Sequence, residues 1–363
     1  MKKMRKGVKI ALCILLTLVL IAGAYVAYVF IDYHRIGDYT VAELVHGDSG
    51  VESCVDVGKP YTALSYNIGF AAYLPDYGFF MDGGTESRAR SKESVVETME
   101  GIENFLDGQN ADFMLLEEVD EPSTRSHHVN ELQMLREHFA GEHDSAYARN
   151  YDSPYLFYPF LSPIGKSVSG IVTLSRYRLV DSIRRSLPIE TGVMKLVDLD
   201  RCYTVSRVPV ANGKVLAIFT FHLSAYTSDG TIATEQLEIL LGEMQKEYEK
   251  GNYCIAGGDF NKDLLGDSSK VFGVDKGEYT WAQPIPAELF TRFGIRMIAP
   301  FNEEKPVPSC RNADGPYNPE QLVLTVDGFL ASANVVVHEA DVVDLGFAYS
   351  DHNPVKMIFE LKD

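Results

Sequence analysis

Basic residues are scarce in this 363-residue sequence once its first positions are set aside. Lysine and arginine total 33, and five of them lie within the first nine residues, which leaves 28 against all 51 acidic residues, a balance of −23. A body this acidic repels polyanions and lacks the basic surface of a general nucleic-acid binder. The composition therefore disfavours DNA as a partner. An alternative interpretation is that the acidity only keeps an exported domain soluble.

Cysteine is also sparse, and no CxxC pair occurs among the five residues Cys13, Cys54, Cys202, Cys254 and Cys310. This spacing indicates neither a metal knuckle nor a redox pair. There is no internal repeat or low-complexity tract, and no aromatic stripe stands out for membrane contact or base stacking. Hydrophobic residues make up 46% of the chain, as expected of a folded protein.

Only one long uncharged run is present, at residues 10–31, directly behind the basic residues of positions 2–9. About 20 apolar residues suffice to span a bilayer, and a basic flank favours a cytoplasmic N-terminus. We therefore expect a cytoplasmic segment at 1–9, a transmembrane anchor at 10–31 and an extracytoplasmic body. A signal peptide cleaved near Ala24 is the alternative, but the apolar run continues past that point and exceeds the usual 7–15 residues.

The body divides into a juxtamembrane linker with little structure at 32–60 and a catalytic domain at 61–363. Residues 262–320 are rich in glycine, proline and aspartate and are expected to form long loops around a site. Apolar periodicity predicts helices at 91–106, 129–139 and 231–248. Strands are expected at 61–67, 113–119, 168–175, 202–209, 214–222, 253–258, 322–330 and 355–361. Many strands with few helices favour two packed sheets with helices outside.

Four short stretches, far apart in the chain, place polar side chains at the edges of apolar, strand-like runs. They are Ser-Tyr-Asn-Ile at 65–68, Leu-Glu-Glu-Val at 116–119, Gly-Gly-Asp-Phe-Asn at 257–261 and Ser-Asp-His-Asn-Pro at 350–354. Each supplies one or two oxygen ligands or an imidazole. Phosphoester hydrolysis needs a cation beside the phosphate oxygens and a group that orients the attacking water. Brought together, these stretches would build such a site.

In this order the stretches resemble the endonuclease/exonuclease/phosphatase superfamily, which has the DNase-I-like fold, over about residues 61–361. The resemblance implies an α/β fold, a four-layer sandwich of two mixed β-sheets flanked by helices. It also implies a metal-dependent hydrolase that acts on phosphoester bonds.

The resemblance assigns the metal to Glu118, assisted by Asn67 and with Asp351 near it. Mg²⁺ prefers oxygen ligands and typically takes one or two carboxylates from the protein. We therefore expect Mg²⁺, with Mn²⁺ as the alternative. Glu117 stands where the family usually has glutamine, so the choice between two adjacent carboxylates stays open, and we favour Glu118.

The same resemblance assigns catalytic roles to four further residues. Asp259 orients or deprotonates the water, and Asn261 contacts the phosphate. His352 acts at the scissile phosphate, and Asp327, in Val-Asp-Gly-Phe at 326–329, is the partner of its other ring nitrogen.

Further candidates carry a weaker signal. His222 ends the apolar strand at 214–222, where sphingomyelinases and inositol phosphatases have a histidine that contacts phosphate. Arg125, His127 and His128 follow closely after Glu118 and could bind a second phosphate or a headgroup, although a solvated loop is the competing interpretation.

We therefore expect a membrane-anchored, extracytoplasmic phosphoesterase whose substrate is a lipid headgroup or a small phosphodiester, with a phosphomonoester not excluded. An endonuclease for extracellular DNA is the alternative enzyme, and basic loops over the cleft would favour it. A catalytically dead, membrane-tethered binding module is the alternative of another class, and it predicts losses among the metal and histidine positions. No protein partner is implied.

Overall fold

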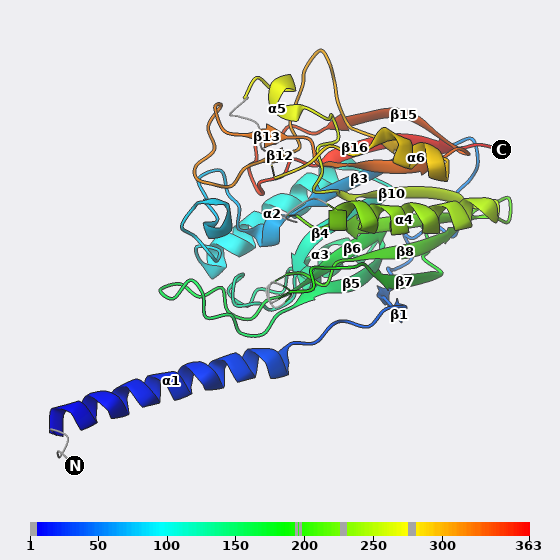
Figure 1. Ribbon diagram of the computed structural model, residues 1–363. Helices are drawn as coiled ribbons and strands as arrows, with labels where there is room; N and C mark the ends of the chain where they lie inside the picture. The colour runs from blue at the N-terminus through cyan, green and yellow to red at the C-terminus, as the bar shows by residue number, and fades with distance from the viewer. Residues whose placement is uncertain (1–5, 193–194, 196–197, 226–230, 275–280) are drawn as a thin grey trace.

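The computed structural model describes residues 6–192, 195, 198–225, 231–274 and 281–363 (Figure 1). One sheet has seven strands in the spatial order β1 (Thr40–Val41), β7 (Asp181–Ser186), β8 (Cys202–Pro209), β9 (Val215–His222), β10 (Tyr253–Asp259), β14 (Asp327–Ser332) and β11 (Ile295–Ile298). We call it the first sheet. The second sheet has the order β15 (Val335–Val342), β16 (Val355–Leu361), β3 (Pro60–Asn67), β4 (Phe113–Asp120), β6 (Val168–Ser175), β5 (Asp144–Asp152) and β2 (Glu43–Val45).

The remaining elements cover the two sheets or connect their strands. The helices are α1 (Lys6–Asp32), α2 (Lys92–Gln109), α3 (Glu131–Phe139), α4 (Thr231–Glu249), α5 (Ser268–Val271) and α6 (Ala287–Phe293). Two short 3₁₀ helices, η1 (Gly69–Ala71) and η2 (Phe80–Asp82), follow β3, and a small two-stranded ribbon joins β12 (Cys310–Arg311) to β13 (Val323–Leu324).

Three hydrophobic cores hold four layers together. Side chains of both sheets, such as Leu115 and Ile255, share the central core. A second core packs α2 and α3 on the outer face of the second sheet. A third packs α4 and α6 on the outer face of the first sheet. The four-layer α/β sandwich that the sequence predicted is confirmed.

Helix α2 shows how local sequence sets these layers. Ser91 precedes the helix, and its side chain accepts a hydrogen bond from the Ser94 amide at 3.1 Å, which satisfies one free donor of the first turn. Val95, Met99, Ile102 and Leu106 then recur at helical spacing and are buried. Asn110 ends the helix in the left-handed conformation.

The first 60 residues contain more structure than predicted. Residues 32–60 contribute β1 and β2, which pair with β7 of the first sheet and β5 of the second. The segment is therefore attached to both sheets, because its backbone completes edge strands that side-chain periodicity does not reveal.

Helix α1 projects from the body (Figure 1). Among the described helices, it is long and apolar enough to cross a membrane, a criterion that a signal sequence would also meet.

Other boundaries also differ from the sequence prediction. The strand expected at 322–330 is divided into β13 and β14, because the Ser309 hydroxyl accepts hydrogen bonds from the amides of Val326 at 2.9 Å and Asp327 at 3.1 Å. The region 262–320, expected as loops, also contains α5, α6, β11 and β12. Strands β5, β7 and β15 were not predicted.

Candidate active site

The polar stretches of the sequence meet at the ends of the central strands. Asp259, at the end of β10, lies in register with His222 on parallel β9 and with Asp327 on antiparallel β14. In the second sheet, Asn67 at the end of β3 lies in register with Glu117 on parallel β4. Since the two sheets pack face to face, these ends border one cavity.

Strand β10 passes through the most crowded part of the sandwich. A Cβ atom at Gly257 would lie 2.7 Å from Cδ1 of Leu115 on the other sheet, and one at Gly258 would collide with the Phe221 carbonyl oxygen. Only glycine allows this close approach. The two glycines therefore let β10 deliver Asp259 between the sheets.

A bulge in β4 separates the two adjacent glutamates. The pairing of β4 with β6 shifts between Leu116 and Val119, and Glu118 has a φ of 56°. A positive φ is uncommon outside glycine and costs about 1–3 kcal/mol. The bulge turns Glu118 into the cavity, where Nδ2 of Asn67 lies 3.4 Å from its Oε1 atom. Bulges often re-aim a side chain beside active sites.

Glu117 occupies a different environment. It is fully buried, accepts a hydrogen bond from the Ser65 hydroxyl at 3.2 Å and is not among the described residues that line the cavity. Burial, followed by the charges of Asp327 and Asp259, raises the pKa of Glu117 well above its ordinary value. Of the two carboxylates, the structure therefore places Glu118 where a metal could reach it.

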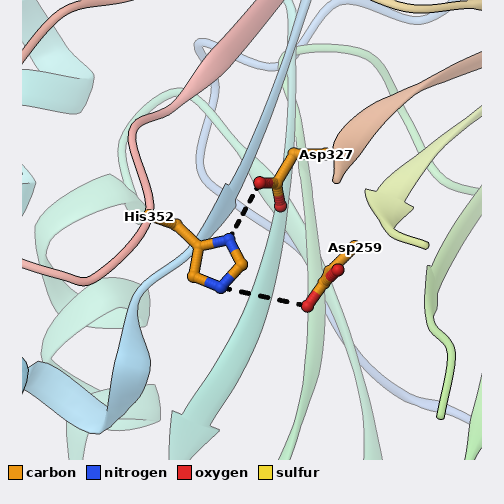
Figure 2. A group of neighbouring side chains, drawn as sticks. All are labelled: Asp259, Asp327 and His352. Carbon is orange, nitrogen blue, oxygen red and sulfur yellow. Dashed lines mark hydrogen bonds and ion pairs between the residues drawn. The ribbon is translucent and has the colours of Figure 1, made fainter. Parts of the chain in front are cut away.

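His352 is held by a buried carboxylate (Figure 2). Its Nδ1 atom lies 2.8 Å from Oδ2 of Asp327, and its Nε2 atom lies 4.0 Å from Oδ2 of Asp259. Burial lowers the pKa of His352, but the Asp327 carboxylate and the contact with Cys310 together outweigh burial and raise this pKa well above its ordinary value. This shift favours the protonated ring, which presents Nε2–H to the cavity.

Asp259 and His222 form the opposite wall. Burial raises the pKa of Asp259 to about 7, with His352 opposing and Asp327 adding to the shift. Its Oδ2 atom lies 3.5 Å from Nε2 of His222 and accepts a hydrogen bond from the Asn261 side-chain amide at 3.1 Å. Burial, and then the charge of Arg201, lower the pKa of His222 well below its ordinary value. The site therefore favours the charged form of His352 and the neutral form of His222.

These groups line a cavity of about 420 Å³. The predicted residues in its wall are Asn67, Glu118, Arg125, His222, Asp259, Asn261, Asp351 and His352. Asp327 lies behind His352. The structure does not bring His127 or His128 to the described wall, and Nε2 of His127 lies 2.7 Å from the Ala89 carbonyl oxygen instead.

Arg125 is buried in the wall and largely occupied. It donates two hydrogen bonds to the Asp120 carboxylate, at 2.7 and 3.1 Å, and stacks at 4.0 Å on the Phe70 ring. Its Nη1 atom lies 3.9 Å from Oε2 of Glu118. The guanidinium therefore contributes positive charge beside Glu118.

Arg201, which precedes β8, was not predicted as a site residue. Its side chain lines the cavity and is 5% exposed, and its Nε and Nη1 atoms have no hydrogen-bond partner within the described part of the chain. The nearest carboxylate, Asp198, lies 4.0 Å from Nε. A buried guanidinium with two nitrogens that make no hydrogen bond, and with one long ion pair, is unfavourable, so this arrangement fits an anionic ligand. Arg201 belongs to no motif, and the sequence holds no signal for it.

Cys310 also lines the cavity, with Sγ 3.6 Å from Nε2 of His352. This contact raises the question of a cysteine nucleophile. Burial, opposed by His352, raises the pKa of the Cys310 thiol to about 12. The thiolate is the nucleophilic form, so the protonated thiol argues against this chemistry.

The oxygen donors fit a hard divalent cation. Glu118, Asp351 and the Asn67 side chain face the same cavity, and burial, opposed by Arg125 and reinforced by Asp351, raises the pKa of Glu118. A bound cation would offset the burial of the Glu118 carboxylate and its repulsion by Asp351. Asp259, Asp327 and His352 also cluster within 4.8 Å of one another, but a metal there would displace the 2.8 Å contact between His352 and Asp327. We favour the set around Glu118.

The two-sheet fold and the acid–histidine site define a metal-dependent phosphoester hydrolase. The sequence profile described as "Endonuclease/Exonuclease/phosphatase family" matches residues 64–352, and the chain belongs to this family.

Several solved structures share this fold. An endonuclease/exonuclease/phosphatase from Beutenbergia cavernae DSM 12333 superposes with a TM-score of 0.58 at 17% identity, over 84% of this chain and 72% of the other. ANGEL2, described as a 2′,3′-cyclic phosphatase, gives a TM-score of 0.56 at 14% identity, over 89% and 99%. D. rerio TDP2 bound to a single-strand DNA product gives a TM-score of 0.52 at 13% identity, over 83% of this chain and 99% of the other. A search of curated protein sequences found no match.

Proposed function

We propose that the chain is a membrane-anchored, Mg²⁺-dependent phosphoesterase that acts outside the cytoplasm on a lipid headgroup or a small phosphodiester. The observation that carries the proposal is the convergence of His352, Asp259 and Arg201, whose Nε and Nη1 atoms make no hydrogen bond, on the cavity that Glu118 lines. The raised pKa values of His352 and Asp259 support it. Mn²⁺ would serve the same donors.

Each cavity residue has a separate role in the proposed hydrolysis. Asp259, whose pKa is about 7, accepts the proton of the attacking water, and the Asn261 amide holds that carboxylate in place. As the new P–O bond forms, the P–O bond to the leaving group breaks, and the leaving oxygen takes up a proton from solvent water. His352 donates a hydrogen bond through Nε2–H to a phosphate oxygen that the phosphoryl group keeps. Arg201 neutralises charge on the same group, and His222 contacts it as a neutral donor.

Glu118, Asn67 and Asp351 would hold the metal. A bound divalent ion stabilises negative charge on the phosphoryl oxygens. Asn67 is fixed for this task, since its Oδ1 atom accepts a hydrogen bond from the Gly69 amide at 3.0 Å and its carbonyl accepts one from the Ser350 hydroxyl at 2.8 Å.

The substrate preference rests on charge and on the anchor. The chain carries a net charge of −18, which disfavours a DNA polyanion, and α1 would keep the body beside a membrane. DNA hydrolysis stays the alternative for the same cavity. A catalytically dead module is not supported, because the sequence keeps the expected residue type at every metal and histidine position of the site.

A substrate panel tests the proposal. Full-length protein in detergent is assayed with Mg²⁺, with Mn²⁺ and with chelator on sphingomyelin, phosphatidylinositol phosphates, bis-nitrophenyl phosphate and plasmid DNA. We expect metal-dependent release from bis-nitrophenyl phosphate and from at least one lipid. Activity that survives the chelator, or that is confined to plasmid DNA, would refute it.

A further inference from the structure

The connection between β5 and β6 exposes an unusual number of large apolar side chains. Residues 155–161, Tyr-Leu-Phe-Tyr-Pro-Phe-Leu, which we call the aromatic loop, include no charged residue in a chain of net charge −18. Phe160 is 73% exposed and Leu161 is fully exposed. Contiguous exposed apolar surface of this kind marks an interaction site. The aromatic residues lie in one loop without strand or helix periodicity, so no aromatic stripe for membrane contact was predicted from the sequence.

The aromatic loop is attached to α1. The Tyr25 hydroxyl accepts a hydrogen bond from the Phe157 amide at 2.8 Å and donates one to the Tyr155 carbonyl at 3.2 Å. The Tyr28 hydroxyl accepts one from the Tyr155 amide at 3.0 Å. These contacts lie on the last two turns of the apolar run of α1, close to where it meets the body.

This attachment sets the depth of the aromatic loop. An α-helix rises 1.5 Å per residue, so Tyr25 lies about 9 Å from Ile31, the end of the uncharged run, along the helix axis. When α1 spans a bilayer, a loop bonded to Tyr25 lies at the boundary between headgroups and acyl chains. Aromatic side chains are enriched at this boundary, where apolar groups insert to about 5–10 Å.

Aromatic rings connect the loop to the catalytic cavity. The Tyr158 ring contacts Phe80 at 5.7 Å between centroids, Phe80 contacts Phe79 at 4.8 Å, and Phe79 contacts Tyr73 at 5.5 Å. Phe79 and Tyr73 line the cavity, as does Met81, which is exposed. A membrane at the aromatic loop would therefore lie on the side of the cavity that Tyr73, Phe79 and Met81 line.

We propose that the aromatic loop inserts into the interface of the bilayer that α1 spans and presents the cavity to phospholipid headgroups. The insertion is independent of catalysis, whereas the presentation of headgroups rests on the proposed phosphoesterase function. The occupant of the apolar surface is a lipid bilayer rather than a protein, because the surface is continuous with the spanning helix and carries no charge to select a protein partner.

Fluorescence tests the insertion. Trp281 is the single tryptophan, so a substitution to tryptophan adds a readable signal. Full-length Leu161→Trp is reconstituted in phosphatidylcholine vesicles with or without bromine on the acyl chains. We expect the brominated lipid to remove most of the emission that the substitution adds. The matched control is Ile239→Trp, at an exposed position on α4, which packs on the other sheet, and its added emission should persist. Equal quenching of the two variants, or none at position 161, would overturn the insertion.

Turnover tests the presentation of headgroups. Phe160→Ser combined with Leu161→Ser leaves the cavity wall unchanged. We expect turnover of a vesicle phospholipid to fall about tenfold, as lost interfacial contact predicts, while turnover of bis-nitrophenyl phosphate stays within about twofold. Unchanged lipid turnover would overturn the presentation. If the wild type hydrolysed neither substrate, the proposed function and the presentation would both fall, whereas the quenching result would still decide the insertion.

Discussion

The Nδ1 atom of His352 lies 2.8 Å from Oδ2 of Asp327, and both side chains are buried at the edge of the cavity. The two residues come from different elements, the loop before β16 and the first position of β14. Because Asp327 fixes the ring and its charge, the pair acts as one unit.

We therefore expect the effects of His352→Ala and Asp327→Ala not to add. Removing a group that stabilises transition-state charge typically costs about 10²–10³ in kcat. Since both substitutions disable the same unit, the double variant should be nearly as active as His352→Ala alone. His222→Ala, which contacts Asp259 from another strand, should lower kcat further in either background. Additive losses from His352 and Asp327 in kcat on one phosphodiester would disprove the pairing.

Glu118→Gln should weaken Mg²⁺ binding while the fold survives. The change removes one carboxylate charge from the cavity but keeps the shape of the side chain. Glu117→Gln is the matched control, because Glu117 is buried and its raised pKa already favours the neutral acid. Calorimetric Mg²⁺ titration of both variants decides the assignment. Loss of affinity in Glu117→Gln alone would transfer the metal to that residue.

The residues of the site differ in how far sequence could reveal them. Asn67, Asp259 and His352 stand in short motifs at the ends of apolar strands, so their types and their strands could be predicted together. The choice of Glu118 over Glu117 depends on a bulge, and strand alternation alone does not indicate which residue a bulge turns. Arg201 depends entirely on the packing of its neighbours.

The fold shows the same division. The buried strands β9, which begins with five consecutive apolar residues, and β6 were predicted to within a residue. Strand β7 has the polar sequence Asp-Ser-Ile-Arg-Arg-Ser, yet it pairs with β1 and β8 of the first sheet. The Arg184 side chain on β7 donates hydrogen bonds to the carbonyls of Arg149 on β5 of the second sheet and of Asp200. Edge strands β1 and β2 are too short to show a period. Tertiary hydrogen bonds, rather than side-chain pattern, decide these elements.

His143 should make the stability of the protein sensitive to acid. Burial, followed by the charge of Arg176, lowers the pKa of His143 to about 4, against 6.5 ordinarily. Between these values the unfolded chain binds a proton that the folded protein does not. Stability should therefore fall as pH drops from about 6.5 to 4, by at most roughly 3 kcal/mol. His143→Phe should reduce the fall in melting temperature between pH 7.5 and pH 5, and an unchanged dependence would contradict this assignment.

The full-length protein should stay with membranes after a carbonate wash. The expectation rests on the uncharged run at 10–31 behind five basic residues. Protease added to intact cells should digest the body, since basic residues favour a cytoplasmic N-terminus. A mature N-terminus near Ala24 would show instead that a signal sequence is removed. Tyr25 and Tyr28 would then no longer belong to a spanning helix, and their contacts would not hold the aromatic loop at a membrane.

Replacing two buried arginines, Arg184 and Arg201, by methionine should change the free energy of unfolding in different ways. Arg184 donates hydrogen bonds to the carbonyls of Arg149, Gly37 and Asp200 at 2.8–3.0 Å. Arg184→Met removes the donor for all three carbonyls, of which that of Asp200 is in a buried residue, so we expect a loss of roughly 3 kcal/mol in unfolding free energy. Arg201 has unpaired donors, so Arg201→Met should leave stability unchanged or raise it by about 1 kcal/mol.

Activity completes the comparison of the two arginines. Arg201→Met should lower kcat/KM on a phosphodiester about tenfold or more, because charge-assisted hydrogen bonds to phosphate are among the stronger polar contacts. Arg184→Met should lower the melting temperature but leave kcat/KM of the folded fraction near that of the wild type. Thermal unfolding and steady-state kinetics on the same preparations separate the two cases. A destabilised Arg201→Met variant with normal kcat/KM would show that this guanidinium stabilises the fold and does not bind the substrate phosphate.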